Sequence, residues 1–128
     1  MATPGDFLYS KEHEWAKFEA ELVTIGITDH AQNSLGDIVY VELPKIGATL
    51  DQFSNVGVVE SVKAVSDLFT PVGGEVVEVN STIESDPGLV NREPYANGWL
   101  FKVKTKNADA QKASLLSAQA YDRLVKEQ

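Results

Sequence analysis

No cysteine occurs among the 128 residues of this chain. The sequence therefore excludes disulfide bonds, thiolate metal ligands and a thiol nucleophile. If the protein takes part in sulfur chemistry, a bound group has to supply the sulfur. The chain also lacks an apolar run long enough to span a bilayer, and its start has no signal-peptide pattern. We therefore expect no association with a membrane.

Basic residues are scarce. The chain has 11 Lys and Arg against 19 Asp and Glu, which gives a formal net charge of −8. This balance argues against nucleic-acid binding, because contacts to phosphates need clustered basic side chains. It also disfavours an anionic lipid surface. An acidic surface instead keeps the protein in solution and steers it toward basic patches on partner proteins.

Short stretches in which apolar and polar side chains alternate recur along the chain and predict β-strands. The alternating or β-branched stretches cover residues 15–27 (a hairpin), 37–43, 53–59, 64–69, 75–79 and 98–104. Pro44 ends the second of these, because proline cannot donate a hydrogen bond to a neighbouring strand. The bend of the first hairpin has no glycine, so its turn type is open. We predict a mainly β fold in a single domain spanning residues 1–128.

Two helices are expected between and after the strands. Residues 28–36 predict a short helix, near 29–35, which Thr28 or Asp29 can cap and Gly36 can end. Apolar residues recur at three- and four-residue spacing through 109–127, which predicts a C-terminal helix. The remaining segments are irregular: residues 1–7 form a loose N-terminus, and residues 80–97 form a loop with at most a short turn of helix.

Lys63 lies in the bend Ser61-Val62-Lys63-Ala64, between the β-branched runs 53–59 and 64–69. An isolated lysine in a turn is ordinarily a solvated surface residue. Here, however, a strand, a Pro/Gly turn and a further strand repeat in mirrored order on either side of the bend. We predict that the two halves pack as two sheets, with Lys63 at one extreme end. At that position a modifying enzyme can reach the amine.

His13 lies between Glu12 and Glu14, a pattern that is compatible with a metal site or a general base. Neighbouring residues of a strand point to opposite faces, so the three side chains are not expected to converge on one ion. His30 is far along the chain, and we predict no metal site. A hydrolase that uses His13 is a further alternative, but no nucleophile is near in sequence.

Short motifs in a fixed order, from Tyr9 to Trp99 and on into the C-terminal helix, resemble those of glycine cleavage system H proteins, a family of lipoyl carriers. The centre of the resemblance is the run Glu60-Ser61-Val62-Lys63-Ala64, which is similar to a lipoylation site. The other matching motifs are His13-Glu14-Trp15, Gly26-Ile27-Thr28-Asp29-His30-Ala31-Gln32, Leu35-Gly36-Asp37, Val41-Glu42-Leu43-Pro44, Pro71, Gly74-Glu75-Val76, Asn80, Pro87-Gly88-Leu89, Asn91, Pro94-Tyr95 and Gly98-Trp99.

The resemblance implies a carrier and not an enzyme. Its fold would be a lipoyl/biotinyl-type hybrid β-sandwich, also called a barrel-sandwich hybrid. Lipoic acid, in amide linkage to Lys63, would take an aminomethyl group from glycine through the pyridoxal-phosphate enzyme glycine decarboxylase (P protein). It would present that group to the folate-dependent aminomethyltransferase (T protein) and be reoxidised by dihydrolipoyl dehydrogenase (L protein). A lipoate ligase or lipoyl transferase would attach it.

The resemblance also nominates residues around the lysine. The modification motif and its surroundings would comprise Glu60, Ser61, Val62, Ala64 and Asp67. A cleft lined with carboxylates would hold the cationic, loaded arm and limit its hydrolysis. For that cleft we nominate Glu14, Glu12 and Asp67. Glu14 is the strongest of the three, because it lies inside a matching motif.

Two other carrier functions stay open. A biotinyl domain or an acyltransferase lipoyl domain is one, although Val62 and Ala64 flank the lysine where biotin sites usually have methionine. A homologue that mainly relays lipoyl groups to other proteins is the second, since it would keep Lys63 and the same fold. We expect a monomer in the bacterial cytoplasm, or in the mitochondrial matrix if the chain is a matured organellar form.

Overall fold

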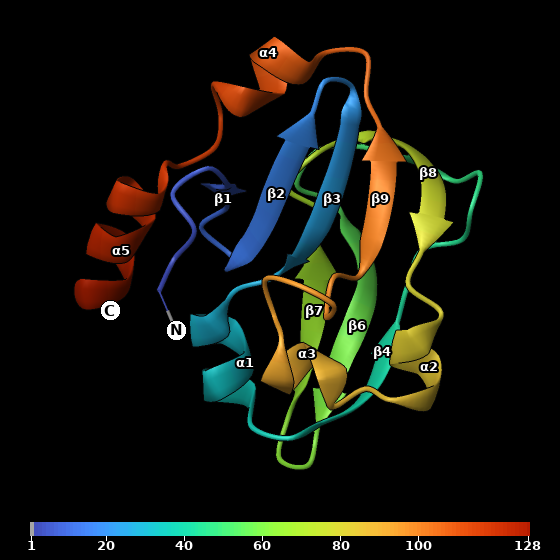
Figure 1. Cartoon of the computed structure of the whole chain (residues 1–128), viewed down its shortest axis with the longest axis vertical. Helices are drawn as coiled ribbons and strands as arrows, with labels where there is room; N and C mark the ends of the chain where they lie inside the picture. Colours follow the sequence, from blue (N-terminus) through green and yellow to red (C-terminus); the bar gives the residue numbers. More distant parts are fainter. Residues whose placement is uncertain (1) are drawn as a thin grey trace.

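The structure is a computed structural model, and it describes residues 2–128. Its strands form two antiparallel sheets (Figure 1). The larger sheet has the strand order β1 (Leu8–Tyr9), β2 (Glu14–Glu19), β3 (Leu22–Ile27), β9 (Phe101–Lys104), β8 (Gly74–Val79) and β5 (Thr49–Leu50). The smaller sheet consists of β4 (Ile38–Glu42), β6 (Asn55–Ser61) and β7 (Val65–Phe69). The helices are α1 (Asp29–Leu35), α2 (Thr82–Ser85), α3 (Leu89–Arg92), α4 (Ala108–Lys112) and α5 (Ala118–Lys126).

The core lies between the two sheets, and alternation explains which residues enter it. Side chains two positions apart on a strand share a face. The larger sheet contributes Val23, Ile25, Val76, Phe101 and Val103, and the smaller sheet contributes Val41, Val59 and Leu68. The prediction of a mainly β fold with two packed sheets is confirmed.

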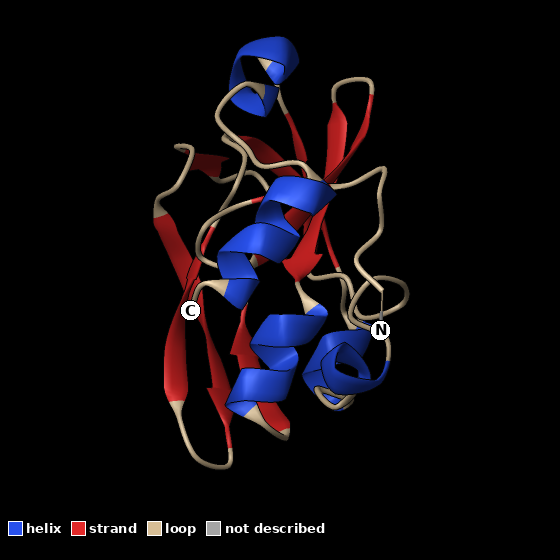
Figure 2. Cartoon of the chain, turned by 90° about the vertical axis from the view of Figure 1, so that its left-hand side faces the viewer, coloured by secondary structure: helices blue, strands red, loops and turns tan. Residues whose placement is uncertain are grey.

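The lysine bend lies at one end of the molecule, as predicted. Strands β6 and β7 pair from Asn55 opposite Phe69 to Glu60 opposite Val65, and residues 62–64 connect them. This connection is the lowest point in both Figure 1 and Figure 2. The sheet thus places Lys63 away from the packed core.

The short helix between β3 and β4 is also confirmed, including its caps. The Thr28 hydroxyl accepts a hydrogen bond from the backbone N–H of Ala31, and Gly36 ends the helix with a φ of +81°. A left-handed φ is costly for residues other than glycine. In the bend of the first hairpin, which has no glycine, Ala20 adopts this conformation with a φ of +57°.

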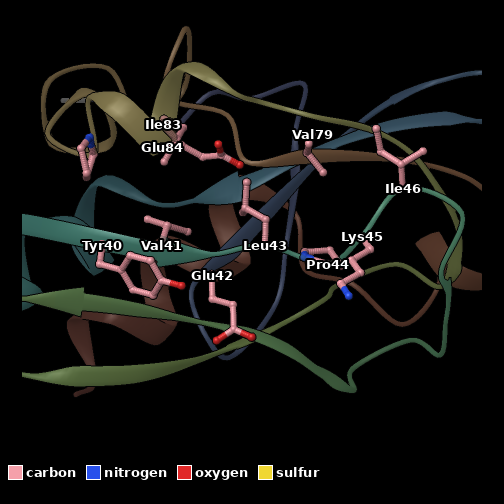
Figure 3. Close-up of a pocket in the computed structure, with 11 residues that line it drawn as sticks. Tyr40, Val41, Glu42, Leu43, Pro44, Lys45, Ile46, Val79, Ile83 and Glu84 are labelled. Carbon is pink, nitrogen blue, oxygen red and sulfur yellow. The ribbon is translucent and has the colours of Figure 1, made fainter.

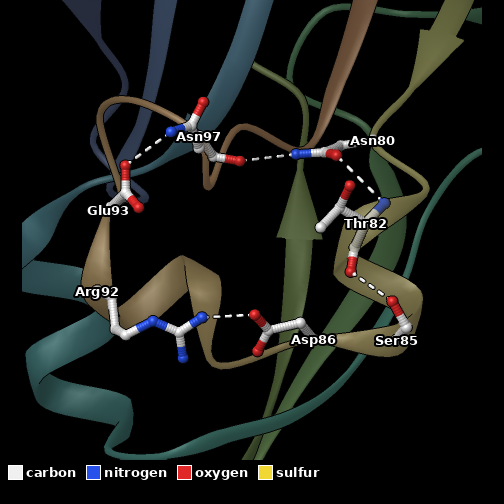
Figure 4. A network of polar contacts seen from close by, with 7 residues as sticks. All are labelled: Asn80, Thr82, Ser85, Asp86, Arg92, Glu93 and Asn97. Carbon is white, nitrogen blue, oxygen red and sulfur yellow. Dashed lines mark hydrogen bonds and ion pairs between the residues drawn. The ribbon is translucent and has the colours of Figure 1, made fainter.

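Residues 80–97, predicted as a loop with at most one short helical turn, contain two short helices, α2 and α3. Three of their apolar residues are buried against the main core: Ile83, Leu89 and Val90. The side-chain amide of Asn80 donates to the carbonyl oxygens of Asn97 (2.9 Å) and Trp99 (2.7 Å) and so ties the segment's beginning to its end (Figure 4).

The predicted single helix over residues 109–127 is wrong. The structure has two helices, α4 and α5, because the chain turns at residues 113–115 and Leu116 then pairs with Tyr9 of β1. Tyr9 and Leu116 exchange two backbone hydrogen bonds, of 2.8 and 2.7 Å, which a continuous helix would prevent. Ser117 then caps α5 by accepting a hydrogen bond from the N–H of Ala120.

The predicted loose N-terminus is shorter than residues 1–7. Phe7 is buried, and its ring lies 4.7 Å from that of Trp15. Upstream of it, the Tyr9 hydroxyl donates to the carbonyl oxygen of Pro4, and the Thr3 hydroxyl donates to Asp122 on α5. Met1 lies outside the described residues, so this part of the prediction stays a prediction.

Candidate functional site

The bend that carries Lys63 is closed by a serine side chain. Ser61 is buried, and its backbone N–H donates to the carbonyl oxygen of Ala64 at 2.8 Å. Its hydroxyl oxygen accepts hydrogen bonds from the N–H groups of Lys63 (3.3 Å) and Ala64 (3.1 Å). One polar side chain therefore takes up two backbone donors at the turn, as Ser commonly does. The bend has a defined shape even though the strands on either side end there.

Lys63 is exposed at this bend, and the chain before β4 lies beside it. A Cβ atom built on Gly36 would lie 3.6 Å from Cε of Lys63, so the lysine stem passes over a glycine. The neighbouring Val62 is 70% exposed, and its N–H donates to the carbonyl oxygen of Asp37 at 3.0 Å. The amine is accessible, while the backbone beneath it is fixed.

Two predicted neighbours of the lysine lie on the outer face of the smaller sheet. Glu60 pairs with Val65, and Asp67 pairs with Val58. Residues that are directly paired across a ladder share a face. That face is the outer one, because the residues that alternate with them, such as Val59, are buried in the core. Glu60 and Asp67 are therefore directed away from the core.

Glu14, at the start of β2, is buried rather than displayed on the surface, with 3% of its area exposed. The Ser10 hydroxyl donates to Oε1 at 2.6 Å, and the backbone N–H of Phe69 donates to Oε2 at 3.3 Å. Burial raises the pKa of the Glu14 carboxyl to about 8, although the hydrogen bonds from Ser10 and Phe69 oppose this shift. Burial thus favours the protonated form of Glu14.

A cavity of about 370 Å³ adjoins Glu14. Its walls are formed by Tyr9, Ser10, Lys11, Glu12, Phe53, Phe69, Ser114 and Leu116. Of the nominated cleft residues, Glu12 lines this cavity, and Glu14 is hydrogen-bonded to two of its wall residues. Asp67 is not in the wall, but it lies two residues before Phe69 on β7, on the same face of the strand.

Sequence reasoning missed most of these walls. Ser10, Phe53 and Leu116 come from three distant segments and carry no local pattern of a binding site. The positive φ of Phe53, +67°, is an unusual backbone conformation for a bulky residue, but the sequence does not reveal it.

His13 and His30 lie side by side, although they are far apart in the sequence. Their ring centroids are 4.7 Å apart, and Nδ1 of His13 lies 2.7 Å from the Tyr121 hydroxyl on α5. Burial, and then the neighbouring His30, lower the pKa of His13. Within residues 2–128, no group of three or more His, Cys, Asp or Glu side chains is arranged to hold a metal ion.

A second cavity, of about 590 Å³, lies between β4 and α2 (Figure 3). Val41, Leu43 and Ile83 form part of its apolar lining, beside the carboxylates of Glu42 and Glu84. Lys63 is not among its lining residues. Over the described part of the chain, no helix has the length and apolarity that crossing a membrane requires.

An exposed lysine on a fixed bend, at the end of a two-sheet β domain, is the arrangement that the resemblance to carriers with a covalently modified lysine predicts. Comparison with known proteins agrees. The family model described as "Glycine cleavage H-protein" matches residues 7–128. The chain belongs to the glycine cleavage H-protein family.

Relatives support this assignment over nearly the full length. The glycine cleavage system H protein of Opitutus terrae is 56% identical, and the match covers 95% of this chain and 96% of that protein. The one from Methylacidiphilum infernorum is 49% identical over 99% and 98%. A crystal structure of the H protein from Mycobacterium marinum matches with a TM-score of 0.89 and 38% identity, covering 97% of this chain and 99% of that one.

Membership settles the coarse function. The chain is a carrier component of the glycine cleavage system and not itself a catalyst, and its partners are components of that system. Members of this family carry lipoate. The fold agrees with the predicted barrel-sandwich hybrid.

Proposed function

We propose that Lys63 carries lipoic acid in amide linkage and that the whole chain acts as one carrier domain. It would shuttle an aminomethyl group from glycine decarboxylase to the aminomethyltransferase and then be reoxidised by dihydrolipoyl dehydrogenase. A lipoate ligase or lipoyl transferase would load it. The observation that carries the proposal is the exposed Lys63 on its fixed bend. Because the relatives named above are bacterial, we place this function in the bacterial cytoplasm.

The residues present fit such a group. The chain has no sulfur nucleophile of its own, and the lipoyl group supplies a dithiol–disulfide couple when it is bound. Gly36 has no side chain that would obstruct the stem of Lys63. Attachment at a fixed point raises the local concentration of the tethered end at each partner. Acylation also removes the charge of the amine.

Three side chains on one face of β7 lie between the lysine bend and the cavity beside Glu14. Their arrangement supports this cavity as the binding site for the aminomethyl-loaded end of the lipoyl arm. Val65, Asp67 and Phe69 alternate onto the outer face of β7, and Phe69 is part of the cavity wall. At about 3.3 Å per residue, Phe69 lies roughly 20 Å along the chain from Lys63. The strand therefore leads from the bend to the cavity.

The chemistry of the cavity suits a cationic amine. Glu12 lines it, Glu14 lies behind Ser10, and Asp67 adds a carboxylate on the approach. An ammonium group placed near Glu14 favours the ionised carboxylate, so Glu14 gives up its proton as the cation arrives. The rings of Phe53 and Phe69 make part of the cavity wall apolar, which disfavours water beside the cargo and so limits its hydrolysis.

Intact mass spectrometry tests the attachment. The protein is purified from a host that makes lipoate, beside the variant Lys63→Arg, which keeps the positive charge but cannot form the same amide. We expect the lipoyl mass increment on the wild type and none on the variant. An unmodified wild type, or an increment that persists in Lys63→Arg, contradicts the proposal.

A further inference from the structure

The lysine bend is held from outside its own hairpin. Ser61 fixes Lys63 and Ala64 within the turn, but the N–H of Val62 donates to the carbonyl oxygen of Asp37, in the segment between α1 and β4. The position of the bend therefore depends on the position of this segment. Asp37 itself is exposed, so its own side chain is not packed into the core.

Asn91 of α3 holds this segment on both sides of Asp37. Its Nδ2 donates to the carbonyl oxygen of Gly36 at 2.9 Å, and its Oδ1 accepts from the backbone N–H of Ile38 at 2.9 Å. The second Nδ2 hydrogen donates to Oε1 of Gln32 on α1, also at 2.9 Å. One amide side chain thus makes three hydrogen bonds that join α3, α1 and the first residue of β4.

The segment is also held by the N–H of Gly36, which donates to the carbonyl oxygen of Gln32, and by the pairing of Ile38 with Ser61. Asn91 adds side-chain hydrogen bonds on both sides of Asp37, where the conformation is least restricted. Gly36 has a φ of +81°, and glycine has more conformational freedom than any other residue when its contacts are lost. The carbonyl of Asp37 follows directly after it and accepts from Val62, next to the lysine. The stem of Lys63 also lies against Gly36. If Gly36 moves, Lys63 is therefore expected to move with it. The two are coupled by the backbone hydrogen bond between Asp37 and Val62 and by the packing of the lysine stem on Gly36.

We propose that Asn91 is a positioning residue for Lys63: by holding Gly36 and Ile38, it keeps the bend in the conformation that the acylating enzyme binds. The inference rests on the proposed lipoylation of Lys63. In that step the amine attacks the carbonyl carbon of lipoyl-adenylate, an amide bond forms, AMP leaves, and the amine loses one proton. Asn91 does not touch the reacting atoms. It acts on the fraction of molecules in which the bend is correctly placed.

This role predicts a specific kinetic signature. If only a fraction of the carrier has the competent bend, the apparent affinity of the ligase falls by that fraction. The chemical step after binding does not change. Loss of Asn91 should therefore raise the KM of a lipoate ligase for this carrier about fivefold and leave kcat within about twofold. The rise in KM is modest because each lost hydrogen bond contributes only a small net free energy to the competent conformation of the bend.

Asn80 offers a matched control. Its Nδ2 also donates to two oxygens, those of Asn97 and Trp99, and its Oδ1 accepts from the N–H of Thr82 at 3.3 Å. It lies in the same 80–97 segment (Figure 4). Its side chain is hydrogen-bonded to Thr82, Asn97 and Trp99 and not to residues 36–38 or to the bend. Asn80→Ala thus removes an amide side chain with three hydrogen bonds, as Asn91→Ala does, but leaves the contacts of the lysine bend in place.

The experiment compares the wild type, Asn91→Ala, Asn91→Asp and Asn80→Ala. Asn91→Asp keeps the acceptor for Ile38 but loses both donated bonds, so it tests the proposal even if the alanine variant does not fold. Steady-state lipoylation with purified lipoate ligase, ATP and lipoate gives KM and kcat for each folded carrier. Amide hydrogen exchange at Val62 reports the bend independently of any modification.

We expect a raised KM and about tenfold faster exchange at Val62 in both Asn91 variants, with both values near wild type in Asn80→Ala. Wild-type values in Asn91→Asp, or an equal rise of KM in Asn80→Ala, would overturn the positioning role. A wild type that the ligase does not modify at all would instead refute the proposed function, while the exchange rates would still decide whether Asn91 orders the bend.

Discussion

Replacing Glu14 with glutamine should change how the stability of the protein depends on pH. The folded carboxyl has a pKa of about 8, against an ordinary value of 4.5, because it is buried beside Ser10 and Phe69. Between these two values the folded state binds more protons than the unfolded state. The free energy of unfolding therefore falls as pH rises through this window and levels off above pH 8. Glutamine resembles the protonated acid in shape and has no proton to lose.

The size of the effect follows from the two pKa values. A carboxyl that titrates near 4.5 when unfolded and near 8 when folded lowers the unfolding free energy by about 2.5 kcal/mol between pH 5.5 and pH 7.5. All other titrating groups are shared by the wild type and Glu14→Gln. The difference in stability between the two proteins should therefore shift by this amount in favour of the glutamine variant over those two pH units.

Urea unfolding at pH 5.5, 6.5 and 7.5, followed by tryptophan fluorescence, measures this difference directly. Glu12→Gln serves as the control, because it removes a neighbouring carboxylate that is exposed. We expect its stability to fall with pH almost as in the wild type, because burial, and only to a small extent the charge of Glu12, raises the pKa of Glu14. If the wild type and Glu14→Gln run parallel from pH 5.5 to 7.5, Glu14 does not hold its proton in the folded protein, and the argument from burial is refuted.

Two further predictions concern the cavity and the bend. Glu14→Gln should shorten the lifetime of the loaded aminomethyl form, because a neutral amide attracts the cationic cargo less than a carboxylate does; an unchanged rate of ammonia release would contradict the cavity proposal. Ser61→Ala leaves the N–H groups of Lys63 and Ala64 without their acceptor, at a cost of about 1–2 kcal/mol, and should speed amide exchange at these two positions about tenfold. Exchange as slow as in the wild type would mean that the hydroxyl does not order the turn.

Local patterns in the sequence were sufficient for the first helix and for every strand except the two-residue strands β1 and β5, which are too short to show alternation. Alternation predicts which strand residues enter the core, since two-residue periodicity and burial on one face are the same constraint. The pair Thr28 and Gly36 predicts where α1 begins and ends, because each satisfies backbone groups close to itself in sequence. The prediction of one continuous C-terminal helix was wrong because its interruption depends on a contact with a distant part of the chain. The helical spacing of its leucines gives no sign that Leu116 pairs with Tyr9, more than a hundred residues earlier.

The site divides in the same way. The position of Lys63 on an exposed bend can be predicted from the sequence, because the bend and the two strands on either side of it are contiguous. Glu14 can be nominated, but its burial cannot be predicted, because it depends on Phe69 donating from another sheet. The contacts of Asn91 with Gly36 and Ile38 span more than fifty residues. Such contacts are decided by tertiary packing, which no local pattern records.

The two sheets also differ in how they can be assembled as the chain is synthesised. The smaller sheet is built from residues 38–69 alone, so its pairings, including the lysine hairpin, need only a consecutive stretch of chain. The larger sheet cannot close until much later, because β9 is hydrogen-bonded between β3 and β8 and contributes residues 101–104. Pairings between distant segments form slowly. A nascent chain that stops short of residue 101 would therefore already contain every strand that supports Lys63, while β3 and β8 would still lack the strand that joins them.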